Sequence, residues 1–427
     1  MFPKLKKFFK NLGPGLITGA ADDDPSGIAT YSQTGAQFGY GMLWTAVFML
    51  PFQAGVQEAC ARIGAVTGRG IAANIKRLYG KKILYVVVFL LLIANTINIG
   101  ADIGAMAAAA DLIFPVGFIP LALIFTLTIL LLEILTSYKV YSKILKWSVV
   151  TLLAYPLTVF MINQPWTTIL AATFIPHIQF NFQFLFIITG VLGTTISPYM
   201  FFWQASEEVE EERQVRLLKV DGKPRIDGQF MHNLRVDNFV GMLSSEIGTW
   251  AIIVVAATVL NSHGITDIKT AADAAKALEP LVNTFPNAGY LAKVIFSVGI
   301  MGLGFLSIPV LAGSAAYAVA ETFSLKEGLN LKLKTAPGFY GIIAISMLIG
   351  LMINFIGIDP IKALVYTAVI NGVVAVPLIF VIAKIANNGS ILGQYKSGRL
   401  SNFLVWTAFA GLGLASIGML AIVLNIV

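Results

Sequence analysis

The chain has 427 residues, of which 57% are hydrophobic and 12% charged, whereas soluble domains carry roughly 25% charged residues. This composition excludes an ordinary soluble domain and predicts a membrane protein that crosses the bilayer several times. The formal net charge of +7 would also suit nucleic acid. The positions of the basic residues, however, match the order of the predicted membrane segments. The expected partner is therefore the lipid bilayer and not nucleic acid. The single cysteine, Cys60, and the absence of a nucleophile elbow or phosphate-binding glycine loop indicate that the chain is not an enzyme.

Eleven apolar segments reach the length of about 20 residues that spans a bilayer as a helix. The sequence therefore predicts an all-α polytopic membrane protein with eleven transmembrane helices. In chain order the segments lie at roughly 12–38, 42–62, 83–110, 117–136, 144–163, 184–206, 237–261, 291–320, 338–357, 360–384 and 402–426.

The first segment is interrupted at its centre by Asp22, Asp23 and Asp24, which run into Pro25. A charged side chain at bilayer depth costs at least about 2.5 kcal/mol, and irregular backbone is excluded from lipid, so this stretch must line a protein-walled or wet cavity. Pro25 has no N–H and releases the C=O of Ala21 from its helical bond. We therefore expect Asp24 and the Ala21 carbonyl to bind a cation, with Asp22 and Asp23 nearby. Because like charges oppose one another's ionisation, at least one of the three carboxylates should be held by a cation, a hydrogen bond or a proton.

Two polar side chains of the third segment, Asn98 and Asp102, stand one helical turn apart and therefore on one face. They indicate either an ion or proton route or a hydrogen bond between helices. In the second segment Glu58 and Arg62 are also one turn apart, and we interpret them as a structural pair.

The sixth segment is broken in the same way, because Pro198 releases the C=O of Thr194. Ser197 adds a hydroxyl oxygen beside this break. Two segments interrupted at corresponding positions are the best sequence indication of a transporter substrate site near the bilayer midplane. The alternative is a pair of proline kinks, with hydroxyls that bond back to their own backbone.

Three further features lie later in the chain. Residues 207–235, which begin with a run of glutamates, have the composition of a solvated linker; the run either concentrates cations or marks the end of a helix. Glu246 lies some ten residues, or about 15 Å, into the seventh segment and is a second candidate for ion coupling. Asn371 of the tenth segment precedes Gly372 and is expected to face the site.

A cytoplasmic N-terminus places every basic residue on the cytoplasmic side except Lys269, Lys276, Lys293 and Lys362. The positive-inside rule thus predicts a multi-pass inner-membrane protein with its N-terminus in the cytoplasm and its C-terminus outside. Five segments that start inside, followed by five that start outside, predict an inverted pair of repeats, about 11–165 and 183–386. A peripheral helix at about 402–426 completes a single transmembrane domain, 1–427.

Three stretches carry a resemblance to a known family: GPGLITGAADDDPSGIAT at 13–30, QEACARIGAVTGRG at 57–70 and GTTISPY at 193–199. Over essentially its whole length the chain resembles the NRAMP family of divalent-metal transporters. The resemblance implies the same 5 + 5 inverted repeat, with the broken first and sixth helices of a LeuT-like fold. It also implies metal ligands at Asp24, at the carbonyls of Ala21 and Thr194, and at the positions of Gly27 and Ser197.

The chain departs from the family at several of these positions. The family's Asp-Pro-Gly-Asn reads Asp24-Pro25-Ser26-Gly27 here, and its Met-Pro-His reads Ser197-Pro198-Tyr199. A family aspartate that transfers protons falls at Asn98 or Ile99, and Asp102 matches a second acidic position.

A hydroxyl in place of a thioether favours hard ions such as Mg²⁺, or Mn²⁺ with lower discrimination. Lost side-chain ligands also leave room for the waters that Mg²⁺ retains. The chain is similar to the NRAMP-related magnesium transporters in lacking these ligand side chains. We therefore expect an importer of divalent cations that works by alternating access and is driven by membrane potential without protons.

Two other functions stay open: a transporter of a small organic molecule such as an amino acid, and a sensor that does not transport. We expect no permanently bound cofactor, since the divalent metal ion would be the substrate. A monomer is the simplest arrangement, with the oligomeric state left open.

Overall fold

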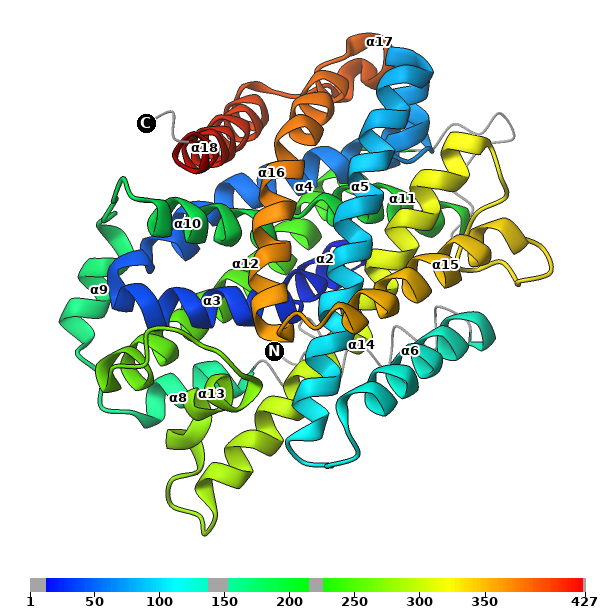
Figure 1. Ribbon diagram of the computed structural model, residues 1–427. Helices are drawn as coiled ribbons and strands as arrows, with labels where there is room; N and C mark the ends of the chain where they lie inside the picture. Colours follow the sequence, from blue (N-terminus) through cyan, green and yellow to red (C-terminus); the bar gives the residue numbers. More distant parts are fainter. Residues whose placement is uncertain (1–12, 137–152, 215–225, 425–427) are drawn as a thin grey trace, which may run out of the picture.

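The computed structural model describes residues 13–136, 153–214 and 226–424, and in these ranges the regular structure is helical (Figure 1). The α-helices are α2 (Pro14–Asp22), α3 (Pro25–Phe38), α4 (Trp44–Thr67), α5 (Ile71–Asp111), α6 (Phe118–Leu135), α8 (Ala154–Met161), α9 (Trp166–Phe174), α10 (Phe182–Thr195), α11 (Pro198–Gln214), α12 (Gly228–Val259), α13 (Ala271–Ala275), α14 (Ala288–Phe323), α15 (Pro337–Ile353), α16 (Pro360–Ala386), α17 (Gly389–Leu392) and α18 (Arg399–Val423).

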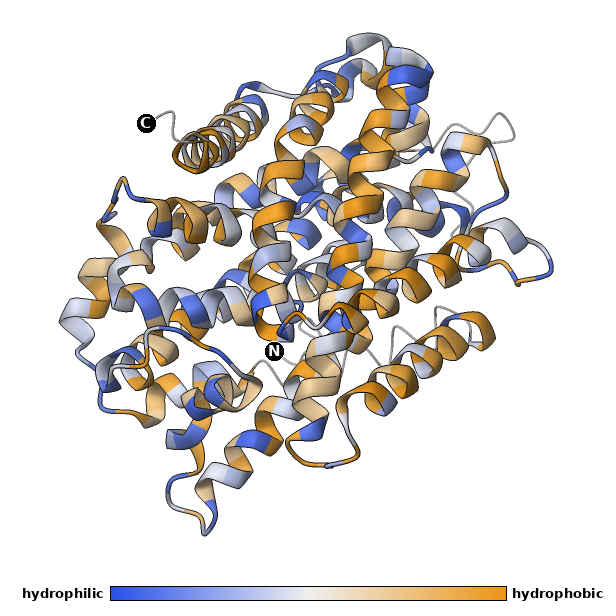
Figure 2. Ribbon diagram, viewed as in Figure 1, coloured by the Kyte–Doolittle hydropathy of each residue, from blue (hydrophilic) through white to orange (hydrophobic). Residues whose placement is uncertain are grey.

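Among the described residues, the membrane-spanning pattern agrees with the sequence at eight of the eleven predicted segments, all except 12–38, 42–62 and 144–163. Within the described ranges, eight helices or joined helix pairs are long and apolar enough to cross a bilayer, by length and composition. The pairs α2 with α3 and α10 with α11 occupy the first and sixth predicted segments, and the other predicted segments coincide with single helices. The fifth, 144–163, overlaps α8 but begins outside the described residues. Orange apolar ribbon covers most of these helices in Figure 2, as expected where helices face lipid.

Both predicted breaks are present. α2 ends at Asp22 and α3 begins at Pro25, while α10 ends at Thr195 and α11 begins at Pro198. Proline suits the first position of a helix, where its missing N–H has no partner to lose. α2 packs on α12, and α10 packs on α16. In Figure 1 the label of α2 lies at the centre of the bundle.

Glycines bring these helices close together. A Cβ at Gly19 of α2 would overlap the backbone of Gly241 in α12, and a Cβ at Gly193 of α10 would overlap the backbone of Gly372 in α16. Small residues at such crossings let helix backbones approach in a membrane protein. The two half-helices that end at the breaks are therefore held by backbone-to-backbone packing.

α5 begins at Ile71, but Gly80 (φ 76°) is non-helical and forms a kink, and the part of α5 beyond this kink agrees with the predicted span 83–110. The run of glutamates lies at the end of α11, which confirms the interpretation as a helix end, but the predicted solvated linker is wrong for residues 207–214. Glu207, Glu208, Glu210 and Glu212 are buried, because α11 packs against α4 and α14. The helix of Glu246, α12, begins at Gly228, before the predicted apolar segment 237–261. The short helix α13 lies between α12 and α14.

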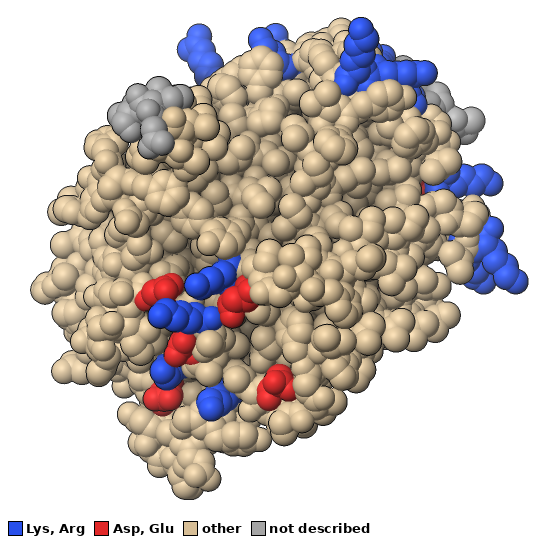
Figure 3. All heavy atoms as spheres, in the orientation of Figure 1, with Lys and Arg blue, Asp and Glu red and all other residues tan. Residues whose placement is uncertain are grey.

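Charged residues are unevenly distributed. Figure 3 shows lysine and arginine along the end of the molecule at which α5 begins and α16 ends, with a smaller group of both signs lower on the same face. We call the former the basic end. It includes Arg77, Lys81, Lys82 and Lys396, which are exposed.

Candidate metal site

Asp24 occupies the break between α2 and α3 and caps α3. Its backbone is extended (φ −66°, ψ 172°), and its Oδ1 accepts hydrogen bonds from the Gly27 N–H at 2.8 Å and the Ser26 hydroxyl at 2.6 Å. Aspartate is a preferred N-cap residue because its oxygen satisfies a free N–H of the first turn. The helix cap therefore accounts for the hydrogen bonds of one of the two carboxylate oxygens of Asp24.

The other oxygen joins a polar network. Asp24 Oδ2 accepts from Asn98 Nδ2 at 2.9 Å, and the same nitrogen lies 3.4 Å from Asp102 Oδ2. Asn371 Nδ2 donates to Asn98 Oδ1 at 3.1 Å, and the Ser307 hydroxyl donates to Asp102 Oδ2 at 2.8 Å. Helices α3, α5, α14 and α16 thus meet at one buried point. The predicted residues Asn98, Asp102 and Asn371 all lie beside Asp24.

This network leaves acceptor atoms without donors. One asparagine amide bridges two carboxylates, and neither Asp24 nor Asp102 forms an ion pair with a basic residue within the described part of the chain. Asp102 Oδ1 and Asn371 Oδ1 are buried and have no hydrogen-bond partner among those residues. Buried carboxylates in this condition need a cation or a proton.

The two predicted carbonyl ligands are also present at the breaks, but each already accepts a hydrogen bond. The Tyr199 hydroxyl donates to the Ala21 carbonyl at 2.8 Å, and the Ser197 hydroxyl is shared between the Gly193 carbonyl at 2.7 Å and the Thr194 carbonyl at 2.8 Å. A carbonyl oxygen has two lone pairs, so each can accept a second partner. Tyr199 bridges the two breaks, since it comes from α11 and holds the end of α2.

Gly27 contributes no side chain. A Cβ at this position would lie 3.4 Å from both the Asp22 carbonyl and the Thr194 hydroxyl, and 3.3 Å from the Tyr31 ring. The glycine therefore lets α3 and α10 approach so closely that even a methyl group there would be crowded.

Asp22 and Asp23 do not share the partners of Asp24. Asp22 Oδ2 accepts from Gln53 Nε2 and from the Ser245 hydroxyl, both at 2.5 Å, and Asp23 Oδ1 lies 3.2 Å from the same hydroxyl. Glu246 is close enough to interact electrostatically with both, is 4% exposed, and has no hydrogen-bond donor among the described residues. The three aspartates therefore divide into two groups, with Asp24 toward α5 and the other two toward α4 and α12.

The two sides of the site differ in packing. Toward the basic end, Asp237 of α12 accepts from the N–H groups of Gly13 and Gly15 at 2.9 and 2.7 Å, and Thr18 hydrogen-bonds to Gln204. These contacts join the start of α2 to α12 and α11, so the three helices are packed together on the side of the site toward the basic end.

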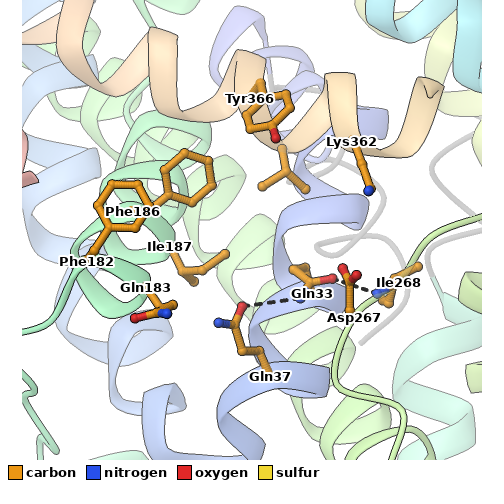
Figure 4. A pocket seen from close by; sticks show the side chains of 11 residues that line it. Gln33, Gln37, Phe182, Gln183, Phe186, Ile187, Asp267, Ile268, Lys362 and Tyr366 are labelled. Atoms are coloured by element: carbon orange, nitrogen blue, oxygen red, sulfur yellow. Dashed lines mark hydrogen bonds between the residues drawn. The ribbon is translucent and has the colours of Figure 1, made fainter. Parts of the chain in front are cut away.

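On the opposite side a pocket of about 220 Å³ lies between α3, α10 and α16, the helices that carry Asp24, Thr194 and Asn371 (Figure 4). Gln33, Asp267 and Lys362 are among its polar lining residues. Gln33 is nine residues, or about 13 Å, along α3 from Asp24. At an intermediate level on α3 the Tyr31 hydroxyl lies 2.9 Å from the Thr195 hydroxyl.

Comparisons with known proteins agree with this geometry. Residues 15–422 match the family model described as natural resistance-associated macrophage protein-like. A divalent metal cation transporter MntH of Caldanaerobacter subterraneus is 24% identical over 407 residues, which cover 94% of this chain and 90% of that protein. The crystal structure of the Eremococcus coleocola manganese transporter is similar with a TM-score of 0.76 and 17% identity, over 97% of this chain and 86% of that one. Mhp1, a nucleobase-cation-symport-1 family transporter, gives a TM-score of 0.60 and 12% identity, over 97% of this chain and 90% of that one.

Proposed function

Because this chain belongs to the natural resistance-associated macrophage protein-like (Nramp) family, we propose that it carries a hard divalent cation, Mg²⁺ or Mn²⁺, across the membrane by alternating access around Asp24. The observation that carries the proposal is the pair of buried carboxylates, Asp24 and Asp102, bridged by the Asn98 amide without an ion-pair partner among the described residues. A dication balances the charge of two carboxylates. The MntH relatives are named as divalent metal cation transporters, which supports this class of cargo.

The proposed ligands are oxygen atoms. They are a carboxylate oxygen of Asp24, the carbonyls of Ala21 and Thr194, the Ser197 hydroxyl and the unpartnered Asn371 amide oxygen. The side chains that the hydrogen-bond network joins to Asp24 offer oxygen or nitrogen, and none offers sulfur. Hard cations such as Mg²⁺ prefer oxygen ligands.

Tyr199 and Ser197 determine how many lone pairs the two carbonyl oxygens have free for a cation. Their hydroxyls occupy one lone pair on Ala21 O and one on Thr194 O. When a cation arrives, each carbonyl coordinates through its second lone pair, or the hydroxyl turns away. Tyr199 belongs to α11 and holds the end of α2, so metal binding at Ala21 acts on the contact between the two broken helices.

We also propose the direction and the driving force. The basic end would face the cytoplasm of a bacterial-type inner membrane, which places the N-terminus inside and the C-terminus outside. The pocket at Gln33 would then face outward and admit the ion. Asn98 carries no charge where the family resemblance places a proton-transferring aspartate, so uptake would follow the membrane potential without protons. Asp22, Asp23 and Glu246 would attract the ion on its route.

Calorimetric titration of the purified protein with Mg²⁺, Mn²⁺ and Cd²⁺ tests the oxygen-ligand assignment. The expected result is measurable binding of Mg²⁺ and Mn²⁺ within about tenfold of one another, with no preference for the softer Cd²⁺. An affinity for Cd²⁺ that exceeds the Mg²⁺ affinity by orders of magnitude would show that a sulfur ligand takes part, and would contradict the proposed site.

A further inference from the structure

A groove of about 580 Å³ lies on the outer surface of the bundle, remote from the metal site. Its walls are α4, α12 and the first turns of α18. Gly55 of α4 lets α18 approach, since a Cβ there would lie 2.7 Å from Leu404 Cβ. On the rim, Phe239 is 47% exposed and Leu400 is 70% exposed. Large apolar side chains so exposed on membrane helices face acyl chains, so the groove opens toward lipid.

The mouth of this groove carries an excess of positive charge. Glu58 is the one carboxylate among its lining residues, and it pairs with Arg62 at 3.0 Å and with Arg235 at 3.2 Å. Arg399 is exposed on the opposite wall. Two guanidinium groups thus share one carboxylate, and Arg399 adds a third positive charge to the groove. The side chain of Arg235 is 60% exposed, so it can reach a ligand without leaving Glu58.

Two further groups at the groove lack partners. α18 is 25 residues long, and no side chain caps its first turn, which follows Gly398. Such a helix start presents free N–H groups and a partial positive charge, which suit a phosphate. Asn238 of α12 also lines the groove; it is 2% exposed, yet both its Oδ1 and its Nδ2 lack a hydrogen-bond partner among the described residues. A buried amide without partners is costly, so its position in the groove indicates a polar ligand group there.

We propose that this groove binds one anionic phospholipid. The phosphodiester lies at the first turn of α18 between Arg235 and Arg399, the Asn238 amide binds the glycerol ester region, and one acyl chain follows Phe239 and Leu404. An apolar groove with a cationic mouth matches this amphipathic ligand, and the bilayer supplies it. A water-soluble phosphate would leave the apolar walls uncovered.

The lipid would act on α2 through α12. The backbone of Asn238 packs directly on Gly15 of α2, where an added Cβ would lie 2.7 Å from Asn238 Cα. The preceding residue, Asp237, binds the N–H groups of Gly13 and Gly15. A ligand that fills the groove therefore stabilises α12 at the turn that holds α2. This binding is independent of the metal cargo, so the two proposals can fail separately.

Native mass spectrometry of the full chain in detergent, with added phosphatidylglycerol or phosphatidylcholine, tests the proposal. The chain should retain one phosphatidylglycerol molecule more tightly than phosphatidylcholine. The double variant Arg235→Gln/Arg399→Gln should bind phosphatidylglycerol about thirtyfold more weakly, from the usual attraction of two basic side chains for anionic lipid. Lys81→Gln/Lys82→Gln is the matched control, since it removes two exposed charges of the same end outside the groove and should bind as the unaltered chain does.

A photoactivatable phosphatidylglycerol then locates the bound molecule. Labelling of α4, α12 and the first turns of α18 would support the proposal. Equal retention of both lipids, equal loss in the two double variants, or labelling confined to other helices would each overturn it. Because these measurements do not involve transport, a chain that carries no divalent metal could still pass them.

Discussion

Asp24 makes two kinds of contact, and substitution by asparagine separates them. Asparagine and aspartate are about equally good N-caps, so Asp24→Asn keeps the acceptor for Gly27 N–H and the Ser26 hydroxyl. Asp24→Ala loses that acceptor, at a cost of about 0.5–2 kcal/mol for the cap. With its one oxygen at the cap, the Asp24→Asn side chain presents an NH₂ group to the Asn98 NH₂, so a charge-assisted hydrogen bond worth about 1.5–3 kcal/mol is lost.

The two variants should therefore share a defect in metal binding and differ in stability. We expect each to bind Mg²⁺ and Mn²⁺ at least about 100-fold more weakly, or about 2.7 kcal/mol, because the charged ligand is lost. Thermal unfolding in detergent should show that Asp24→Ala is the less stable of the two. If Asp24→Asn bound metal within about threefold of the unaltered chain, the carboxylate would be only a helix cap and the site assignment would be wrong.

Three further substitutions test neighbouring parts of the account. Ser197→Met places a thioether at the break of α10 and α11, so calorimetry should show a gain of Cd²⁺ and Mn²⁺ affinity relative to Mg²⁺; an unchanged ratio would remove Ser197 from the ligand set. Tyr199→Phe frees the Ala21 carbonyl from a hydrogen bond worth about 1 kcal/mol, so Mg²⁺ affinity should rise about fivefold, whereas an unchanged affinity would mean that Ala21 is no ligand. Outside the membrane segments, burial and the nearby Glu321 raise the pKa of Glu327 to about 8. Since the folded chain holds this proton more tightly than the unfolded chain, stability should fall as pH rises from about 4.5 to about 8, and Glu327→Gln should flatten that decline in a thermal-unfolding series; an equal slope would refute it.

The parts of the structure that depend on local chemistry could be predicted from the sequence. Pro25 and Pro198 each follow polar residues within an apolar segment, so both breaks were predictable, as were the spans around them. Proline alone is not enough, because Pro51, Pro309 and Pro377 stand inside continuous helices. The Glu58–Arg62 pair is likewise local, because the two side chains are one turn apart on α4. The placement of Asn98 and Asp102 on one face of α5 follows from helical periodicity alone.

Contacts between distant segments could not be predicted. The bond from Tyr199 to Ala21 joins residues 178 apart in sequence, and that from Ser245 to Asp22 joins residues 223 apart. Without them the three aspartates look like one group, whereas their partners divide them between α5 on one side and α4 with α12 on the other. The glutamates at the end of α11 misled the prediction for a related reason. A run of charges usually marks a solvated segment, and only the packing of α11 against α4 and α14 makes it buried.

The most direct test of the central claim is ion flux into proteoliposomes that contain the purified chain, with indicators for Mg²⁺, Mn²⁺ and pH inside and an imposed membrane potential. The account predicts that a negative interior drives Mg²⁺ or Mn²⁺ uptake without acidification, and that Asp24→Asn abolishes this uptake. Metal uptake accompanied by proton entry would contradict the uncoupled mechanism and return Asp102 or Glu246 to a coupling role. No flux of either metal under any potential would contradict the claim that this chain transports a hard divalent cation.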